Sequence, residues 1–325
     1  MENIIINVFI CFIGLLGLFY GGEKLVTGSV SVASIFKVKP QFIAISIIAL
    51  GTSFPELVVS INAVLDKSPG IAWGNVVGSN ISNILLVLGL ASLISPISLT
   101  KKNFNTNIFW LFVSSLTFFI VCIGIKKISF YSGLIFILFL IITLSYSAYI
   151  SKRDNKNQNK IDNKNSFSVG KSILLIFFGI FLLIISAEAV VSSAVKIAYI
   201  FEVPETLIGL TIIAIGTSLP EIAASIIAVK KGHSEIAVGN VIGSNIFNIF
   251  GIIGASAIFS APNDFLVPKS FLSLDIPVML ISTLLFCFLI YYKFIMSRNI
   301  GVIFILSYFI YISLNLKFIV YQKTK

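Results

Sequence analysis

Two 40-residue segments of this chain are closely similar, and this internal repeat limits the folds open to it. Residues 51–90 and 216–255 align without a gap at an offset of 165, and 21 of the 40 aligned positions are identical. Unrelated segments would share only a handful, so the repeat indicates duplication. The same register pairs Gly14 with Gly179 and Glu23 with Glu188, which predicts a repeat that covers most of each half.

Long apolar runs place the chain in a membrane. Hydrophobic residues make up 57% of its 325 positions, charged residues 11%, and the mean hydropathy is +1.04. Soluble domains have about 45–50% apolar and about 25% charged residues. We predict an all-α polytopic membrane protein with ten transmembrane helices and the lipid bilayer as its surroundings. The apolar runs are 4–20, 41–65, 71–95, 106–125, 128–150, 171–200, 206–229, 235–260, 271–292 and 299–320.

A polar segment rich in Asn and Lys divides these runs into two groups of five. We predict a first five-helix half at 1–150 with repeat 51–90, a polar linker at 151–169, and a second half at 170–325 with repeat 216–255. Because five is an odd number of spans, the second half enters the membrane in the opposite orientation. Inverted repeats with a binding site near the bilayer midplane are typical of secondary transporters.

The formal net charge of +10 reflects membrane orientation better than nucleic-acid binding. On a ten-helix layout 15 of the 23 Lys and Arg residues lie on the linker side. The positive-inside rule then predicts a cytoplasmic linker and two external termini, in the cell (inner) membrane of a prokaryote. We expect neither a nucleic-acid partner nor an obligatory protein partner.

Cysteine and histidine offer no metal-ligand pattern. Cys11, Cys122 and Cys287 are isolated in apolar runs, which is typical of small hydrophobic side chains. His233 lies in a polar break between two runs. We therefore expect no zinc site and no cofactor.

Glu56 and Glu221 occupy equivalent positions of the two repeats, with apolar sequence on both sides. A carboxylate inside a span is costly and indicates function. Neither of these runs carries Lys or Arg at comparable depth to neutralise the carboxylate. A bound cation could do so.

Further oxygen ligands surround each Glu in sequence. Pro55 and Pro220 cannot donate a backbone bond, which frees the carbonyls of Gly51 and Gly216 and is expected to loosen those of Ala49 and Ala214. Hydroxyl groups three and four residues before each Glu share its helix face, although such groups commonly bond back to their own helix. These hydroxyl residues are Thr52, Ser53, Thr217 and Ser218.

The next run of each repeat carries a polar stripe, GNVVGSNISN or GNVIGSNIFN. Residues spaced by four line one helix face, which we expect to point into the bundle. The stripes are Asn75, Ser79 and Asn83 in the first repeat and Asn240, Ser244 and Asn248 in the second. Gly74, Gly78, Gly239 and Gly243 are spaced for close helix packing, which we favour over a ligand role.

Together these groups predict a site of two carboxylates and several neutral oxygens. Calcium takes 6 to 8 oxygen ligands and accepts irregular geometry. The same oxygens could hold several Na⁺ ions at overlapping positions. Competition between the two ions for one site would couple their movement in opposite directions.

The paired motifs GTSFPE with GNVVGSNISN, and GTSLPE with GNVIGSNIFN, closely resemble the α-repeats of the cation/calcium exchanger superfamily, particularly its prokaryotic Na⁺/Ca²⁺ exchangers (calcium/sodium antiporters). The resemblance implies exchange of cytoplasmic Ca²⁺ for external Na⁺ by alternating access, with a long first and sixth helix that slide across a rigid core. It also implies that the transported ions are bound by Ala49, Thr52, Ser53, Glu56, Ser79, Asn83, Ala214, Thr217, Ser218, Glu221, Ser244 and Asn248.

Two details refine this resemblance. Some superfamily members, including the K⁺-dependent branch, carry Asp where this chain has Asn248, so we expect two acidic ligands and no K⁺ requirement. Glu23 and Glu188 are expected near helix ends in interfacial or structural roles. The small residues Gly21, Gly22, Gly28, Ser186 and Ala187 suit sliding contact.

Three other functions remain open at this point. In a Ca²⁺/H⁺ exchanger, protonation of Glu56 and Glu221 would replace Na⁺ binding, which a buried carboxylate permits. A Mg²⁺-dependent intramembrane enzyme would need a nucleophile and base or a cation for phosphate, and the sequence shows neither near the two Glu residues. A cation channel would use similar ligands, but the inverted repeat favours alternating access. We therefore expect a transporter and not an enzyme.

Overall fold

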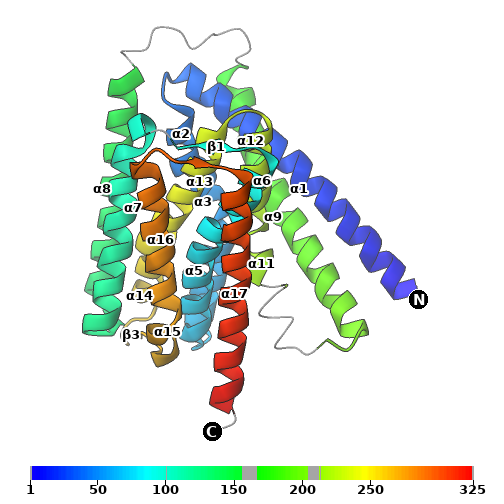
Figure 1. Ribbon diagram of the computed structural model, residues 1–325, viewed down its shortest axis with the longest axis vertical. Coiled ribbons are helices and arrows are strands. Elements are labelled where there is room, and N and C mark those ends of the chain that lie inside the picture. Colours follow the sequence, from blue (N-terminus) through cyan, green and yellow to red (C-terminus); the bar gives the residue numbers. More distant parts are fainter. Residues whose placement is uncertain (1, 100, 156–166, 204–211, 213, 324–325) are drawn as a thin grey trace.

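Figure 1 shows a bundle of long helices in the computed structural model, which describes residues 2–99, 101–155, 167–203, 212 and 214–323. Seven of the described helices are long and apolar enough to cross a membrane, or eight if one bent pair counts as a single span. Of the other expected spans, 271–292 gives the 17-residue helix α16 (Asp275–Tyr291), and 206–229 falls partly outside the described residues. The polytopic, helical class is therefore confirmed.

Two very long helices, α1 (Glu2–Ile35) and α9 (Val169–Ile200), run obliquely side by side (Figure 1). A Cβ at Gly14 would meet Val190, and one at Gly28 would meet the carbonyl oxygen of Ser172 at 2.8 Å, so the two helices are antiparallel. Close backbone approach also explains why α1 continues past the expected run 4–20: its glycines pack against α9 instead of ending the helix.

In the first half, the span around Glu56 is broken. Helix α2 (Pro40–Ile43), a π-helical turn (Ala44–Ile48) and α3 (Ala49–Thr52) lead to a bend of 44° before α4 (Phe54–Leu65). Pro55 follows the bend directly. Helix α5 (Pro69–Ser82) comes next and passes through a second π-helical turn (Asn83–Val87) into α6 (Leu88–Ile94).

The second half repeats these breaks. Helix α11 (Ala214–Gly216) ends before Ser218, and α12 (Leu219–Lys230) begins after it. Helix α13 (Ser234–Ile246) then leads through a π-helical stretch (Phe247–Ile253) into α14 (Gly254–Phe259). Ser53 and Ser218 are equivalent in the repeat, so the same Pro-Glu motif breaks both helices at the same place.

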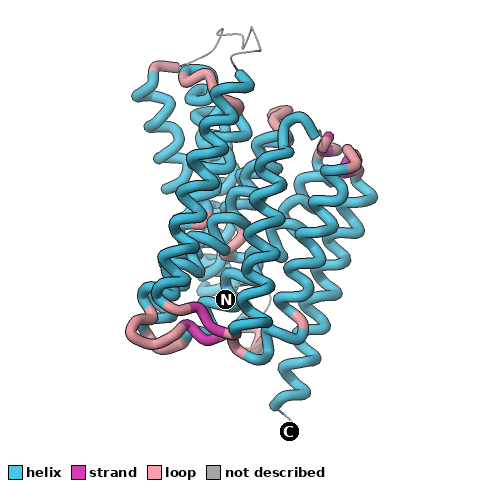
Figure 2. Tube along the Cα trace, turned by 90° about the vertical axis from the view of Figure 1, so that its left-hand side faces the viewer, coloured by secondary structure: helices cyan, strands magenta, loops and turns pink. Residues whose placement is uncertain are grey.

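Four two-residue strands join the halves at their ends. Strand β1 (Ile97–Ser98) pairs with β4 (Ile295–Met296), and β2 (Lys127–Ile128) pairs with β3 (Phe265–Leu266), both antiparallel. Figure 2 shows the two pairs at opposite ends of the bundle. Each pair therefore ties a segment of the first half to a segment of the second.

The remaining helices surround this arrangement. They are α7 (Lys101–Ile120) with its π-helical end (Val121–Ile125), α8 (Phe130–Asn155), the short α15 (Lys269–Ser273), α16, and α17 (Arg298–Lys323). Helix α8 continues to Asn155, into the segment expected as linker, because its last-turn Lys152 and Arg153 suit the negative end of a helix. Most of the expected linker, 156–166, lies outside the described residues.

The helices that carry the polar stripes form the centre of the bundle. The apolar parts of Pro69–Ile94 and Ser234–Phe259 are 78% and 89% buried, against 22% to 28% for the other long helices. Trp73 stacks on Phe265 with ring centroids 4.8 Å apart, which packs α5 against strand β3 of the other half. The centre is therefore polar and packed, and the outer helices present apolar side chains outward.

Candidate functional site

Glu56 and Glu221 lie at the centre of the bundle, each in the first turn of the helix that follows a bend. They are 1% and 0% exposed, and Ser53, three residues before Glu56, donates a hydrogen bond to Glu221. The positive end of each helix dipole favours a carboxylate at this position. Among the described residues, neither Glu forms an ion pair with Lys or Arg.

The bends disrupt fewer backbone hydrogen bonds than expected. The carbonyl oxygen of Ala49 accepts a hydrogen bond of 3.0 Å from Ser53 N–H, so it is not loosened by the proline. The reason is that Pro55 removes the donor for Gly51, two residues further on, and the turn at Ala49 stays intact. In the second half Ser218 N–H donates to the carbonyl oxygen of Ile215 at 3.1 Å. That acceptor is three residues back in the chain, whereas Ser53 N–H donates to an acceptor four residues back. The side chain of Ala214 lies outside the described part.

Hydroxyl groups of one half reach toward the other half. Ser53 donates a hydrogen bond of 3.1 Å to Oε1 of Glu221, and the hydroxyls of Ser82 and Ser218 lie 2.7 Å apart. Thr52 lies 3.4 Å from Oδ1 of Asn240 and is 1% exposed. Thr52, Ser53 and Ser218 therefore each contact the other half, and Thr217 is half-buried.

Three asparagines, Asn80, Asn83 and Asn245, also meet across the halves. Asn83 donates to Oδ1 of Asn245 at 3.0 Å, and Asn245 donates to the carbonyl oxygen of Asn80 at 3.2 Å. Ser79 is 4% exposed and, like these, buried in the centre. These contacts join α5 and the π-helical turn after it to α13, and the stripe residues other than Asn75 are buried inside the bundle.

Several buried polar atoms at this centre have no hydrogen-bond partner among the residues that the structure describes. They are Oε2 of Glu56, Oε2 of Glu221, Oδ1 of Asn83, Oγ of Ser244, and both side-chain polar atoms of Asn248 and of Asn80. An unpartnered buried polar group is costly and calls for a partner such as water or an ion. With two carboxylates, this set of oxygens suits a hard cation.

Asn75 and Asn240 each form hydrogen bonds to the Glu-bearing helix of their own repeat. Asn75 donates to the carbonyl oxygen of Glu56 and to the hydroxyl of Ser60, both at 2.9 Å. The equivalent Asn240 lies 3.4 Å from the hydroxyl of Ser225. Since Ser60 and Ser225 are also equivalent, each repeat uses one Asn–Ser pair to join its Glu-bearing helix to the next.

The glycine pairs differ between the halves. A Cβ at Gly239 would lie 2.9 Å from the carbonyl oxygen of Gln41, and one at Gly243 would lie 2.6 Å from Cα of Ile45. This confirms close packing in the second half. At Gly78 no atom of the described region lies within 4 Å of the Cβ position, and at Gly74 the nearest is an ordinary contact with Phe271.

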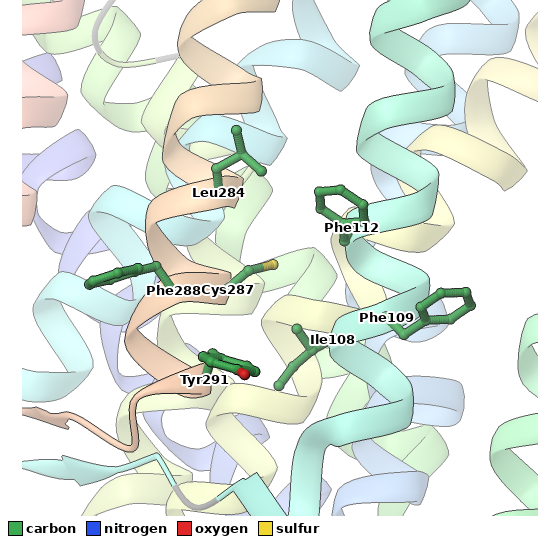
Figure 3. Close-up of a pocket in the computed structure, with 7 residues that line it drawn as sticks. All are labelled: Ile108, Phe109, Phe112, Leu284, Cys287, Phe288 and Tyr291. Carbon is green, nitrogen blue, oxygen red and sulfur yellow. The ribbon is translucent and has the colours of Figure 1, made fainter.

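Outside this centre, the described residues include scattered acidic, histidine and cysteine side chains and a cavity. No group of three or more His, Cys, Asp and Glu residues occurs in the described ranges, and all three cysteines are free. A cavity of about 530 Å³ between α7 and α16 is lined by apolar and aromatic side chains, and Figure 3 shows Phe112 and Leu284 at one end of it and Tyr291 at the other. Such a lining does not suit a cation.

Some polar residues that the structure places at or near the centre were not predicted. Asn80 and Asn245 are equivalent in the repeat and stand in both GSN motifs, so the repeat itself contained a signal for them. Ser82 has Phe247 as its equivalent and carried no such signal.

Asp275 is a buried carboxylate outside the site, where it accepts hydrogen bonds from Tyr311 at 2.7 Å and Asn315 at 2.6 Å.

Comparisons with known proteins agree with this arrangement. The family model described as sodium/calcium exchanger protein matches residues 6–149 and 171–317. An uncharacterized membrane protein of Methanocaldococcus jannaschii is 35% identical over 312 residues, which are 95% of this chain and 98% of that protein. The sodium/calcium exchanger MaX1 of Methanosarcina acetivorans is 30% identical over 293 residues, 79% of this chain and 84% of its own length. A solved structure of the sodium-calcium exchanger NCX_Mj, soaked with zero Na⁺ and Ca²⁺, matches with a TM-score of 0.81 and 34% identity over 95% of this chain and 99% of that one.

Proposed function

The chain belongs to the sodium/calcium exchanger protein family, and we propose that it exchanges Ca²⁺ for Na⁺ across a membrane by alternating access at one shared site. Its family and its structural neighbours are transporters and not enzymes, and they support cation/calcium exchange as its activity. The observation that carries the finer proposal is the pair of buried carboxylates, Glu56 and Glu221, with unpartnered oxygens beside them.

The proposed site takes ligands from both halves. Two carboxylates match the charge of one Ca²⁺, and the neutral oxygens supply the remaining positions of a six- to eight-fold shell. We assign as ligands the side chains of Glu56, Glu221, Thr52, Ser53, Ser79, Asn83, Thr217, Ser218, Ser244 and Asn248, with the carbonyl oxygens of Ala49 and Ala214. The carbonyl oxygen of Ala49 accepts hydrogen bonds from Ser53 N–H at 3.0 Å and from the hydroxyl of Thr52 at 3.5 Å, and in this proposal the ion displaces the longer bond.

Na⁺ is the counter-ion in this proposal because both ions need the same oxygens. Na⁺ ions bound to Glu56 and Glu221 would exclude Ca²⁺, so each ion could cross only in exchange for the other. The transported ions are substrates, and we propose no separate cofactor. The comparisons lend no support to the Ca²⁺/H⁺ alternative.

We further propose ten transmembrane helices in two inverted halves. Two observations support this. The bends at Ser53 and Ser218 are equivalent in the repeat, and the strands β1 and β3, which follow equivalent helices of the two halves, lie at opposite ends of the bundle (Figure 2). Alternating access would then arise as α1 and α9 slide together across the core.

The protein is an integral membrane protein, as its apolar helices and its family indicate. We propose the cell membrane of a prokaryote, with the linker cytoplasmic and both termini outside. A single cysteine placed in 156–166 of a variant without Cys11, Cys122 and Cys287 tests the orientation. An impermeant maleimide should label it in inverted membrane vesicles and not in intact cells; labelling in intact cells contradicts the proposal.

The central test is Ca²⁺ uptake into proteoliposomes loaded with Na⁺ and diluted into Na⁺-free buffer. Uptake should require internal Na⁺ and disappear in the Glu56→Gln, Glu221→Gln double variant. Glu188→Gln, which neutralises an exposed carboxylate of α9, is the matched control and should keep uptake. Uptake that ignores Na⁺ and follows an imposed pH gradient would replace Na⁺ by H⁺ in the proposal.

A further inference from the structure

Two adjacent lysines at the end of α12, Lys230 and Lys231, contact one face of α1. The ammonium of Lys231 lies 3.1 Å from Oε1 of Glu23 and 2.9 Å from the hydroxyl of Thr27. The ammonium of Lys230 lies 5.0 Å from the ring centroid of Phe19. The three α1 residues are spaced by four and therefore lie along one stripe of that helix. We call Lys230 and Lys231 the lysine clamp.

The backbones of α1 and α12 also meet beside the clamp. A Cβ at Gly22 would lie 3.2 Å from Cγ1 of Ile227 and 3.3 Å from the carbonyl oxygen of Ala223. Gly22 precedes Glu23, so the close backbone contact and the ion pair act at the same point. Together they specify one position of α1 along α12.

The repeat does not provide this clamp in the other half. At an offset of 165, Lys230 and Lys231 correspond to Leu65 and Asp66. Glu23 corresponds to Glu188, which is exposed and for which the described structure gives no ion pair. Glu23 and Lys231 are an acid and a base, whereas their equivalents in the repeat, Glu188 and Asp66, are both acids.

Helix α1 packs closely against α9. Gly17, Gly21 and Gly28 of α1 pack directly against α9, with Cβ positions 3.1 Å or less from α9 atoms. Tight backbone contact along this length makes the two helices one body. An attachment of α1 to the core therefore also fixes α9.

We propose that Lys230 and Lys231 are positioning residues that hold the α1–α9 pair in the position described here, and that the Lys231–Glu23 ion pair breaks in every exchange cycle. The inference rests on the proposed alternating access. Because the clamp exists on one side alone, it favours one of the two access states over the other. Neither lysine is among the ion ligands, so the clamp acts through α1.

The test is the maximal rate of Na⁺-driven Ca²⁺ uptake at saturating ion concentrations in proteoliposomes. Glu23→Gln and Lys231→Gln each remove an interaction of the held state that is lost as α1 moves, so each should raise the rate about two- to fivefold. The exchanged pair Glu23→Lys, Lys231→Glu should return the rate toward that of the parent. Glu188→Gln, the repeat-equivalent of Glu23→Gln, should leave it unchanged.

A second measurement separates positioning from general loosening. Amide hydrogen exchange over residues 19–27 should rise in both single variants and fall again in the exchanged pair. Thr27→Val keeps the Lys231–Glu23 ion pair and removes one hydrogen-bond acceptor of Lys231. It should raise the uptake rate less than Glu23→Gln or Lys231→Gln does. An unchanged or lower rate in either single variant, or an exchanged pair that does not restore the parent rate, overturns the inference. Failure of the proposed function would instead appear as no Na⁺-driven uptake in the parent protein.

Discussion

The hydroxyl of Ser53, at the bend before α4, donates a hydrogen bond of 3.1 Å to Oε1 of Glu221, 168 positions later in the chain. A group of the first repeat thus touches the carboxylate of the second. The two bends are therefore parts of one centre, and a change in one half is expected to alter ion binding by the other.

Replacing Ser53 by alanine should raise the half-saturating Ca²⁺ concentration about tenfold or more. The variant loses a proposed ion ligand and a hydrogen bond to a charged group, which contributes about 1.5–3 kcal/mol. Isothermal titration of the purified protein with Ca²⁺ measures the change. Ser46→Ala is the matched control because Ser46 bonds to Phe42 O within its own helix, and its affinity should not change. Equal affinity in Ser53→Ala and the parent would contradict the proposed site.

Replacing Gly243 by alanine should lower the thermal stability of the protein. The new Cβ would overlap the carbonyl oxygen of Ile45 and lie 2.6 Å from its Cα, so backbone must move. Overpacking of this kind costs about 1–3 kcal/mol. Gly78→Ala, the equivalent change in the first half, should be tolerated, since its Cβ position meets no described atom within 4 Å. Thermal unfolding in detergent compares the two, and equal melting temperatures would refute the packing argument.

Asp275 is expected to support stability and not Ca²⁺ binding. It links α16 to α17 through Tyr311 and Asn315, so Asp275→Asn should destabilise the fold by about 1–3 kcal/mol and leave the Ca²⁺ affinity unchanged. Tyr311→Phe removes one of the same bonds, so the two effects should not add. Additive losses of stability, or a weaker Ca²⁺ affinity, would assign Asp275 another role.

Exchange should not depend on potassium. The centre has two carboxylates, and Asn248 stands where some superfamily members carry a third, so the extra negative charge is absent. Replacing K⁺ by choline on both sides of the membrane should leave Na⁺-driven Ca²⁺ uptake unchanged. A rate that rises with added K⁺ would contradict this ligand assignment.

The sequence by itself determined the membrane class, the internal repeat and the two prolines beside which the helices bend. Each of these depends on features close together in the chain. Apolar runs follow from bilayer thickness, and the bends follow from Pro55 and Pro220, which lack an N–H. The two carboxylates could be predicted for the same reason, because their repeated apolar surroundings are visible without any contact being known.

Only the tertiary structure decided which groups meet. The bonds Ser53–Glu221 and Asn83–Asn245 join helices that are distant in sequence, and no periodicity specifies such pairs. The loosened carbonyl expected at Ala49 was wrong because the turn there keeps its own hydrogen bond. The length of α1 likewise depended on packing against α9, since glycine weakens an isolated helix but permits the close contact that stabilises this one.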